Sequence, residues 1–141
     1  MKIKFLALVT LLLSLNFVFG QKDVVITKEQ LPKISQQFID QHFTKQNISY
    51  CIKDHDSFDV KFENGYEVDF DKKGEWKEID CNTEAIPLAI IPASIQQYVN
   101  KNFPQCTIVK IERDHKGYDI ELNNNLDIEF DKKGNFKKID I

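Results

Sequence analysis

The sequence has little of what most enzymes and nucleic-acid-binding proteins require. It contains no G-x-S-x-G, H-E-x-x-H, C-x-x-C or phosphate-loop motif, so the commonest signatures of nucleophilic, zinc and nucleotide-binding sites are missing. Its 19 basic residues are outnumbered by 22 acidic ones, which leaves no basic excess to attract nucleic acid. We therefore expect a protein that is not an enzyme, has no cofactor and does not bind nucleic acid.

Cysteine is scarce, with three residues in 141. An odd number leaves at least one thiol unpaired. A disulfide between Cys51 and Cys81 is disfavoured, because both are expected on the outer strands of one four-stranded sheet. Those strands would lie about 14 Å apart, whereas a disulfide needs Cα atoms within about 7 Å. The sequence leaves the state of these thiols and of Cys106 open.

The sequence has one long apolar run, over residues 5–15, and two lysines precede it. Small residues within 18–20 then place a cleavage point before Gln21, so residues 1–20 have the parts of a secretory signal peptide. A transmembrane anchor is the alternative, but the run is short for a span and no basic stop-transfer cluster follows it. We expect a periplasmic or secreted protein without membrane insertion after cleavage.

What the sequence does contain is an internal repeat. Residues 31–80, shifted by sixty, align with residues 91–140 without a gap, and 17 of the 50 pairs are identical. A regular repeat indicates that two similar structural units pack together. The predicted organisation is a signal peptide at 1–20, a first repeat at 21–81, a linker at 82–90 and a second repeat at 91–141.

Each repeat begins with a predicted helix and continues with four predicted strands. Apolar residues at three- and four-residue spacing after Pro32 and Pro92 give one apolar stripe on each helix. In the strands, apolar and charged residues alternate, as in residues 58–62 and 118–122, which predicts one packed face and one solvated face. We expect an α+β fold with one curved eight-stranded antiparallel sheet and both helices on one face.

The motifs LP…F…HF, Y-x-V-x-F and D-F-D-x-x-G-x-W-K-x-I-D, together with their second copies, resemble the PepSY-like secreted proteins of Bacteroidetes. These proteins are similar in fold to the β-lactamase inhibitor protein. The resemblance implies two tandem units whose joined sheet leaves an open concave face, which in the inhibitor grips an enzyme. PepSY domains elsewhere accompany peptidases and restrain them, so the resemblance implies a role in inhibiting or regulating a peptidase or another envelope protein.

Acidic residues dominate the predicted solvated face. Ten of the twelve outward positions on the second and third strands of the two repeats are Asp or Glu. One interpretation is a solvated face on which neighbouring lysines pair with the acids across strands. The other is a docking face for a basic protein partner. The residues predicted to bind that partner are Asp59, Glu67, Asp69, Asp119, Asp127, Glu129, Trp76 and Phe136.

The positions of Trp76 and Phe136 depend on a backbone detail that the sequence leaves open. Each lies three residues before an apolar Ile, so in a regular strand the two side chains point to opposite faces. The aromatic rings would then be exposed anchors beside the acids. Bulges after Gly74 and Gly134 would instead turn both rings into the core.

A calcium-responsive protein is the alternative function. Asp69-x-Asp71-x-x-Gly74 and Glu129-x-Asp131-x-x-Gly134 are similar to the beginning of a calcium-binding loop, although lysines stand where further oxygen ligands are needed. The candidate ligands for weak calcium binding are Asp69, Asp71, Glu129 and Asp131.

Overall fold

The computed structural model describes residues 23–141. The signal peptide predicted for residues 1–20 lies outside the described residues. The first half of the described chain contains strand β1 (Val24–Ile26), the short helix η1 (Lys28–Gln30), helix α2 (Lys33–His42) and four strands. Those strands are β2 (Ile48–Lys53), β3 (Ser57–Phe62), β4 (Glu67–Asp71) and β5 (Trp76–Asp80).

The second half follows the same order. It contains η2 (Leu88–Ile90), α3 (Ala93–Asn102), β6 (Ile108–Arg113), β7 (Gly117–Leu122), β8 (Asp127–Asp131) and β9 (Phe136–Asp140). All nine strands form one antiparallel sheet in sequence order, from β1 to β9. The α+β class is therefore confirmed. None of the helices in residues 23–141 has the length and apolarity that a membrane span requires.

The prediction of eight strands was wrong by one. The additional strand is β1, which pairs with β2 through Val24 opposite Lys53 and Ile26 opposite Cys51. It has only three residues, so its alternation is too short to recognise in the sequence. Its β-branched Val-Val-Ile sequence suits a strand, and its pairing covers the outer edge of β2.

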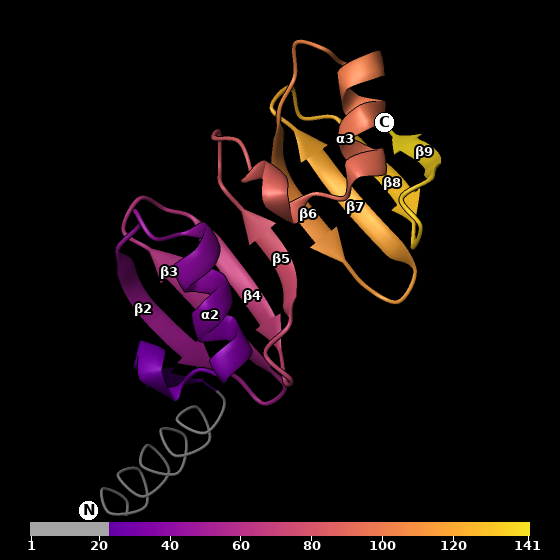
Figure 1. Cartoon of the computed structure of the whole chain (residues 1–141). Helices are drawn as coiled ribbons and strands as arrows, with labels where there is room; N and C mark the ends of the chain where they lie inside the picture. The colour runs from indigo at the N-terminus through magenta and orange to yellow at the C-terminus, as the bar shows by residue number, and fades with distance from the viewer. Residues whose placement is uncertain (1–22) are drawn as a thin grey trace, which may run out of the picture.

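The molecule has two layers, with both helices on the same face of the sheet (Figure 1). The helix-covered face has a continuous row of buried residues, one from each strand from β2 to β8. The row runs through Cys51, Val60, Val68, Ile79, Ile111, Ile120 and Ile128, all at most 2% exposed. The helices cover this row with Ile39 and Phe38 from α2, and with Val99 and Tyr98 from α3. One core therefore continues from the first half into the second.

Two β-bulges decide where the aromatic residues point. The pairing of β4 with β5 shifts by one residue between Asp69 and Phe70, which brings Trp76 opposite Phe70. The same shift in β8 and β9 brings Phe136 opposite Phe130. Both rings consequently lie on the helix-covered face, where Trp76 stacks against Phe38 and Phe136 stacks against Tyr98.

The turn at Gly74 packs against the beginning of α2. The hydroxyl of the fully buried Ser35 donates a hydrogen bond to the carbonyl oxygen of Gly74 over 2.8 Å. Gly74 has a φ of +88°, and a Cβ atom there would come within 2.5 Å of Pro32. A side chain at this position would therefore be strained and would push the turn away from the helix.

The segment at 82–90, predicted as a linker, is packed against the sheet. The Cys81 and Ile86 amides donate to the carbonyl oxygens of Val109 and Ile108, which continues the contact between β5 and β6. Ile86 is 1% exposed. The three cysteines are free thiols, and Cys51 and Cys81 are buried.

The two aromatic positions should contribute unequally to stability. Trp76 is 9% exposed and Phe136 is 44% exposed. Trp76→Ala should lower the free energy of unfolding by about 3 kcal/mol, because it leaves a cavity under α2, whereas Phe136→Ala should cost about 1 kcal/mol. Urea titrations of both variants measure the difference. Equal losses would mean that Trp76 is less buried than described.

Candidate functional site

Six carboxylates lie side by side across the sheet face that no helix covers, which we call the open face. Each is paired in register with the next on the neighbouring strand, from β3 to β8. This acidic row consists of Asp59, Asp69, Glu78, Glu112, Asp119 and Glu129. At a strand spacing of about 4.8 Å it extends over roughly 24 Å. Within the described residues, no Lys or Arg interrupts this register, and Lys138 follows Glu129 at its β9 end.

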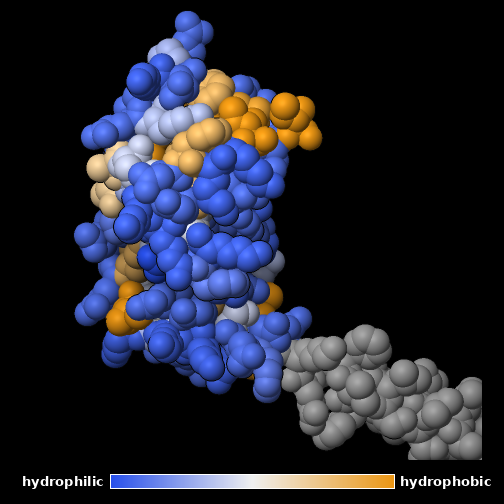
Figure 2. Space-filling view, turned by 90° about the vertical axis from the view of Figure 1, so that its right-hand side faces the viewer, coloured by the Kyte–Doolittle hydropathy of each residue, from blue (hydrophilic) through white to orange (hydrophobic). Residues whose placement is uncertain are grey.

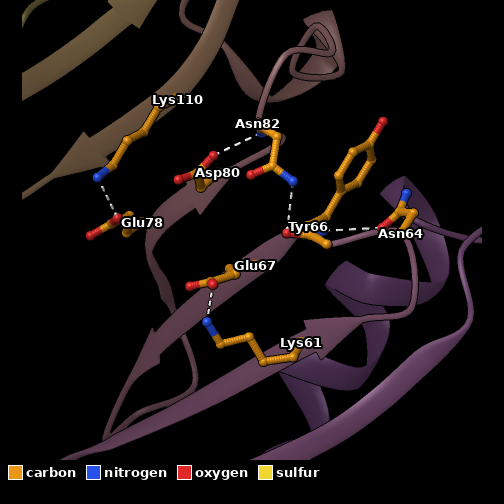
Figure 3. A network of polar contacts seen from close by, with 9 residues as sticks. Lys61, Asn64, Tyr66, Glu67, Glu78, Asp80, Asn82 and Lys110 are labelled. Carbon is orange, nitrogen blue, oxygen red and sulfur yellow. Dashed lines mark hydrogen bonds and ion pairs between the residues drawn. The ribbon is translucent and has the colours of Figure 1, made fainter.

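The neighbouring row on the same face has both signs of charge. Lys61 on β3 forms an ion pair with Glu67 on β4, and Lys110 on β6 lies 2.8 Å from Glu78 on β5 (Figure 3). Asp127 lies in this row, opposite Glu121. Ion pairs therefore reach both rows, since Glu78 and Glu129 of the acidic row also contact lysines. Like charges also face each other in the neighbouring row, as Glu67 does Asp80. The acidic row differs in that all six of its residues are acids.

The centre of the acidic row is the contact between Glu78 and Glu112, which joins the two halves of the chain. The hydrogen bond with Glu78, followed by burial, raises the pKa of Glu112 to about 7. Burial also acts to raise the pKa of Glu78, but hydrogen bonds from Glu112 and Lys110 outweigh it and lower that pKa. The pair thus retains one proton, held mainly by Glu112, at pH values where isolated carboxylates are ionised.

The same effect extends to both sides of this pair. Burial raises the pKa of Asp69 to about 6, assisted by the charges of Asp59 and Glu78. Burial is also the main cause that raises the pKa values of Asp59 and Asp119. The row therefore concentrates negative charge that its own environment compensates incompletely.

Shallow depressions lie along the acidic row, and two of them include Glu112 and Asp119 in their lining. One has a volume of about 250 Å³, and its lining contains two cations, Lys77 and Arg113, beside the acids Asp69, Glu78, Glu112, Asp114 and Asp119. The second, of about 280 Å³, is lined by residues of β6 to β9, including Glu112, Asp119 and Glu129. Both are open hollows rather than enclosed cavities, which suits contact with a macromolecule better than enclosure of a small ligand.

An exposed apolar patch lies at the β1 end of the open face. Val25 pairs with Ile52, and Ile52 pairs with Asp59, so the acidic row continues into these two apolar residues. Tyr50 has the same parity on β2 and is 43% exposed, and Val25 is 73% exposed. The second repeat has Lys110 and Glu112 at the positions that correspond to Tyr50 and Ile52, so the patch occurs in the first half of the described chain.

The structure brings together four of the predicted binding residues: Asp59, Asp69, Asp119 and Glu129. Glu67 and Asp127 lie in the neighbouring row. Trp76 and Phe136 are not anchors on this face, because the bulges turn them toward the helices. The sequence reasoning missed Glu78 and Glu112. The bulge shifts the parity of β5, and β6 has a register shift between Ile108 and Lys110, so alternation alone could not assign their faces.

The predicted calcium-loop residues have other local roles. The Asp71 carboxylate accepts hydrogen bonds from the Lys73 and Glu75 amides at 2.8 and 3.0 Å, and Asp131 accepts the equivalent bonds in the second half. Asp69 and Glu129 belong to the acidic row instead. In residues 23–141, no group of three Asp, Glu, His or Cys side chains is arranged to hold a metal ion.

Comparisons with known proteins place this architecture among exported bacterial proteins. A protein-family model described as "Putative beta-lactamase-inhibitor-like, PepSY-like" matches residues 56–138. A solved structure described as "a putative calcium-regulated periplasmic protein" from Bacteroides thetaiotaomicron is 44% identical, with a TM-score of 0.82, and the match covers 84% of this chain and 97% of that chain. No curated protein matches the sequence.

Two solved structures from Bacteroides vulgatus are also similar. One is described as "a putative periplasmic protein of unknown function" and is 38% identical, with a TM-score of 0.81, covering 84% of this chain and 99% of that chain. The other, described as "a putative periplasmic protein", is 38% identical, with a TM-score of 0.82, covering 86% of this chain and 98% of that chain. The periplasmic or secreted localisation that the sequence predicted is thereby confirmed.

The raised pKa values predict that the protein loses stability as the pH rises from about 4 to about 7. Over this range the folded state releases the protons of Asp69 and Glu112 less readily than the unfolded state does, so ionisation favours unfolding. Glu112→Gln should remove part of this dependence and stabilise the protein at pH 8 by about 1 kcal/mol, allowing for solvent screening.

Thermal unfolding of both proteins between pH 4 and pH 8 tests this prediction. The matched control is Glu121→Gln, which removes a charge from the neighbouring row on the same face and should leave the shape of the profile unchanged. A wild-type melting temperature that rises from pH 5 to pH 8 would mean that the pKa values of Asp69 and Glu112 are not raised in the folded state.

Proposed function

Because the chain belongs to the PepSY-like family, we propose that it is an exported, non-catalytic binding module that holds a basic partner protein on the open face. The observation that carries this proposal is the acidic row. Six like-charged side chains in direct register oppose folding, so their presence favours a role that offsets their cost to stability. A cationic partner gains from every carboxylate that it contacts.

The raised pKa values support a basic partner rather than a neutral one. A protein cation placed beside Glu112 or Asp69 would favour the ionised carboxylate and lower its pKa, so that binding and proton release are coupled. Binding should therefore strengthen as the pH rises through 6 to 7. The extended negative potential would also accelerate encounter with the partner at low salt.

The apolar patch formed by Val25, Tyr50 and Ile52 supplies the anchor that we propose in place of Trp76 and Phe136. Exposed aromatic and aliphatic side chains beside charges commonly contribute most of the binding energy of a protein interface. The patch adjoins Asp59 at the end of the acidic row. The partner surface that fits is therefore apolar at one end and basic along roughly 24 Å.

The proposal includes two further features that the sequence predicts. They are a signal peptide at residues 1–20 and two tandem units at 21–81 and 91–141, joined by residues 82–90. The likeness to the β-lactamase inhibitor protein, expressed in the description of the family, supports inhibition or regulation of an exported peptidase or another envelope protein.

The test combines capture with a measured affinity. The chain from Gln21 onward is crosslinked in the native envelope fraction, the captured protein is identified and purified, and its dissociation constant is measured. The variant Asp69→Asn/Glu112→Gln/Asp119→Asn should bind at least about tenfold more weakly, because three charge contacts are lost. Tyr50→Ala should also weaken binding, because it removes the aromatic ring from the apolar patch.

The matched control has the same change in net charge away from the acidic row. Asp56→Asn/Glu63→Gln/Glu84→Gln replaces three exposed acids and should bind like the wild type. Equal loss in the two triple variants would reduce the effect to net charge and would argue against a site on the open face.

A calcium response is the second candidate function, and one relative supports it: the 44% identical periplasmic protein is described as calcium-regulated. A divalent cation bound at the open face would relieve the repulsion within the acidic row. Millimolar Ca²⁺ should then raise the melting temperature more than Mg²⁺ does, and the triple variant of the acidic row should lose this rise.

Asp71→Asn/Asp131→Asn separates the open face from the turns. Because these carboxylates already accept backbone hydrogen bonds, the variant should keep the calcium-dependent rise if the ion lies on the open face. Loss of the rise in this variant alone would place the ion at the turns. Equal melting temperatures with and without Ca²⁺ would end this proposal.

A further inference from the structure

The outer edge of β9, the last strand of the sheet, is not paired in the described residues, whereas β5, the corresponding strand of the first half, pairs with β6 through the equivalent edge. Residues 136–140 lie sixty positions after Trp76–Asp80 and follow the same type of bulge. Strand β5 is covered by β6, whereas the described residues contain no strand on the outer edge of β9. Ile79 and Cys81 are fully buried, but Ile139 is half-buried and Ile141 is exposed.

Figure 2 views the molecule from the side on which β9 lies in Figure 1. Most of this surface is hydrophilic, and apolar residues gather in its upper part, where the C-terminal half lies. Phe136 and Ile141 are among the exposed large apolar residues of that half. An edge strand offers unpaired main-chain groups to another strand, and the charged residues of β9 restrict this pairing to a strand of complementary charge.

The contact between β5 and β6 shows how this type of edge is covered. Ile79 lies opposite Ile111, and Asp80 lies opposite Lys110. The Arg113 guanidinium lies 4.0 Å from the centre of the Trp76 ring, and its Nε donates a hydrogen bond of 2.7 Å to the Trp76 carbonyl oxygen. Ile111 thus closes the core at Ile79, and Arg113 covers one face of the Trp76 ring.

At the positions through which β5 contacts β6, strand β9 has residues of the same kind as β5, except that one charge is reversed. Phe136 is stacked on Tyr98 on one side at a centroid distance of 4.8 Å, and among residues 23–141 no cation covers its other side. Ile139 and Asp140 correspond to Ile79 and Asp80, whereas Lys138 replaces Glu78. A strand with the β6 sequence would oppose Lys138 with a glutamate, where β5 opposes Glu78 with Glu112. The charges of β9 therefore suit such a strand better than those of β5 do.

We propose that β9 accepts an extended segment of a partner protein by antiparallel strand addition, and that this segment has the pattern Lys-apolar-Glu-Arg. Its lysine pairs with Asp140, its apolar residue packs on Ile139, its glutamate pairs with Lys138 and its arginine covers Phe136. Main-chain hydrogen bonds provide affinity, and the alternating side chains provide selectivity. The main-chain edge of β9 is distinct from the acidic row, although Lys138 and Asp140 lie on the open face beside the β9 end of that row. The proposed strand addition does not depend on the proposed function of the acidic row.

A second copy of the chain is a weaker candidate for this position. The strand that corresponds to β6 is β2, and β1 already covers its outer edge. Strand β2 also offers Tyr50 and Ile52 where β6 has Lys110 and Glu112, so it has no charges to pair with Asp140 and Lys138. Charge complementarity thus favours a different protein.

The probe is a labelled peptide with the sequence of residues 107–114, titrated with the chain from Gln21 onward. Its matched control is the same peptide with Lys110→Glu and Glu112→Lys, which keeps the composition and reverses both charge pairs. The first peptide should bind about tenfold more tightly, because two cross-strand pairs change from attractive to repulsive. Amide chemical shifts should change at residues 136–140 and not at 76–80.

Reversal in the protein completes the test. Lys138→Glu/Asp140→Lys should exchange the preference, so that the control peptide binds more tightly than the first peptide. Phe136→Ala should weaken the binding of both peptides. Glu opposite Glu129 repeats the Asp69–Glu78 pair of the first half, so the variant should fold, and its melting temperature checks this. Equal affinity for the two peptides, no binding to the wild type, or a β9-mediated dimer in sedimentation that the peptide does not dissociate would overturn the proposal.

Discussion

The register of the antiparallel sheet is the constraint on which the rest of this structure depends. Each strand is aligned with the next so that residues of the same kind face each other across as many as nine strands. One row, from Cys51 to Ile128, is entirely apolar and buried, and the adjacent row, from Asp59 to Glu129, is entirely acidic. Because side chains alternate with a period of two, a shift by one residue would place the acids under the helices. The buried row therefore maintains the acidic row, and its burial offsets the repulsion between the carboxylates.

The register has a further consequence at the contact between β5 and β6. It makes one core out of two halves through Ile79 and Ile111, and it places Glu78 directly opposite Glu112 on the other face. Without this contact, the acids of each half would form two shorter rows. The partial protonation of Glu112 and the ion pair between Lys110 and Glu78 show how the structure limits the repulsion at this point. The site is thus a product of the joining of the halves rather than of either half alone.

Much of the fold could be predicted from local patterns. The alternation in residues 58–62 and 118–122 and the apolar stripes after Pro32 and Pro92 predicted the strands and helices, because each period is visible within a few residues. The positions of Trp76 and Phe136 could not be predicted, since a bulge of one residue reverses the face of everything that follows it. The short strand β1 escaped detection because three residues give too little alternation, and the exposed patch around Tyr50 and Ile52 depends on where β1 pairs.

By itself, the amino-acid sequence predicted the two helices, the strands β2 to β9, their order, the acidic character of one face and the periplasmic or secreted localisation. Each of these predictions follows from composition or from a pattern over short distances. Only the tertiary structure decided which acids stand next to each other, that Glu78 and Glu112 complete the row, and that Trp76 is covered whereas the edge of β9 is not. Those features depend on the pairing of strands and on single-residue bulges. The free energy that selects them comes from burying the apolar row in one register, which is a property of the whole sheet.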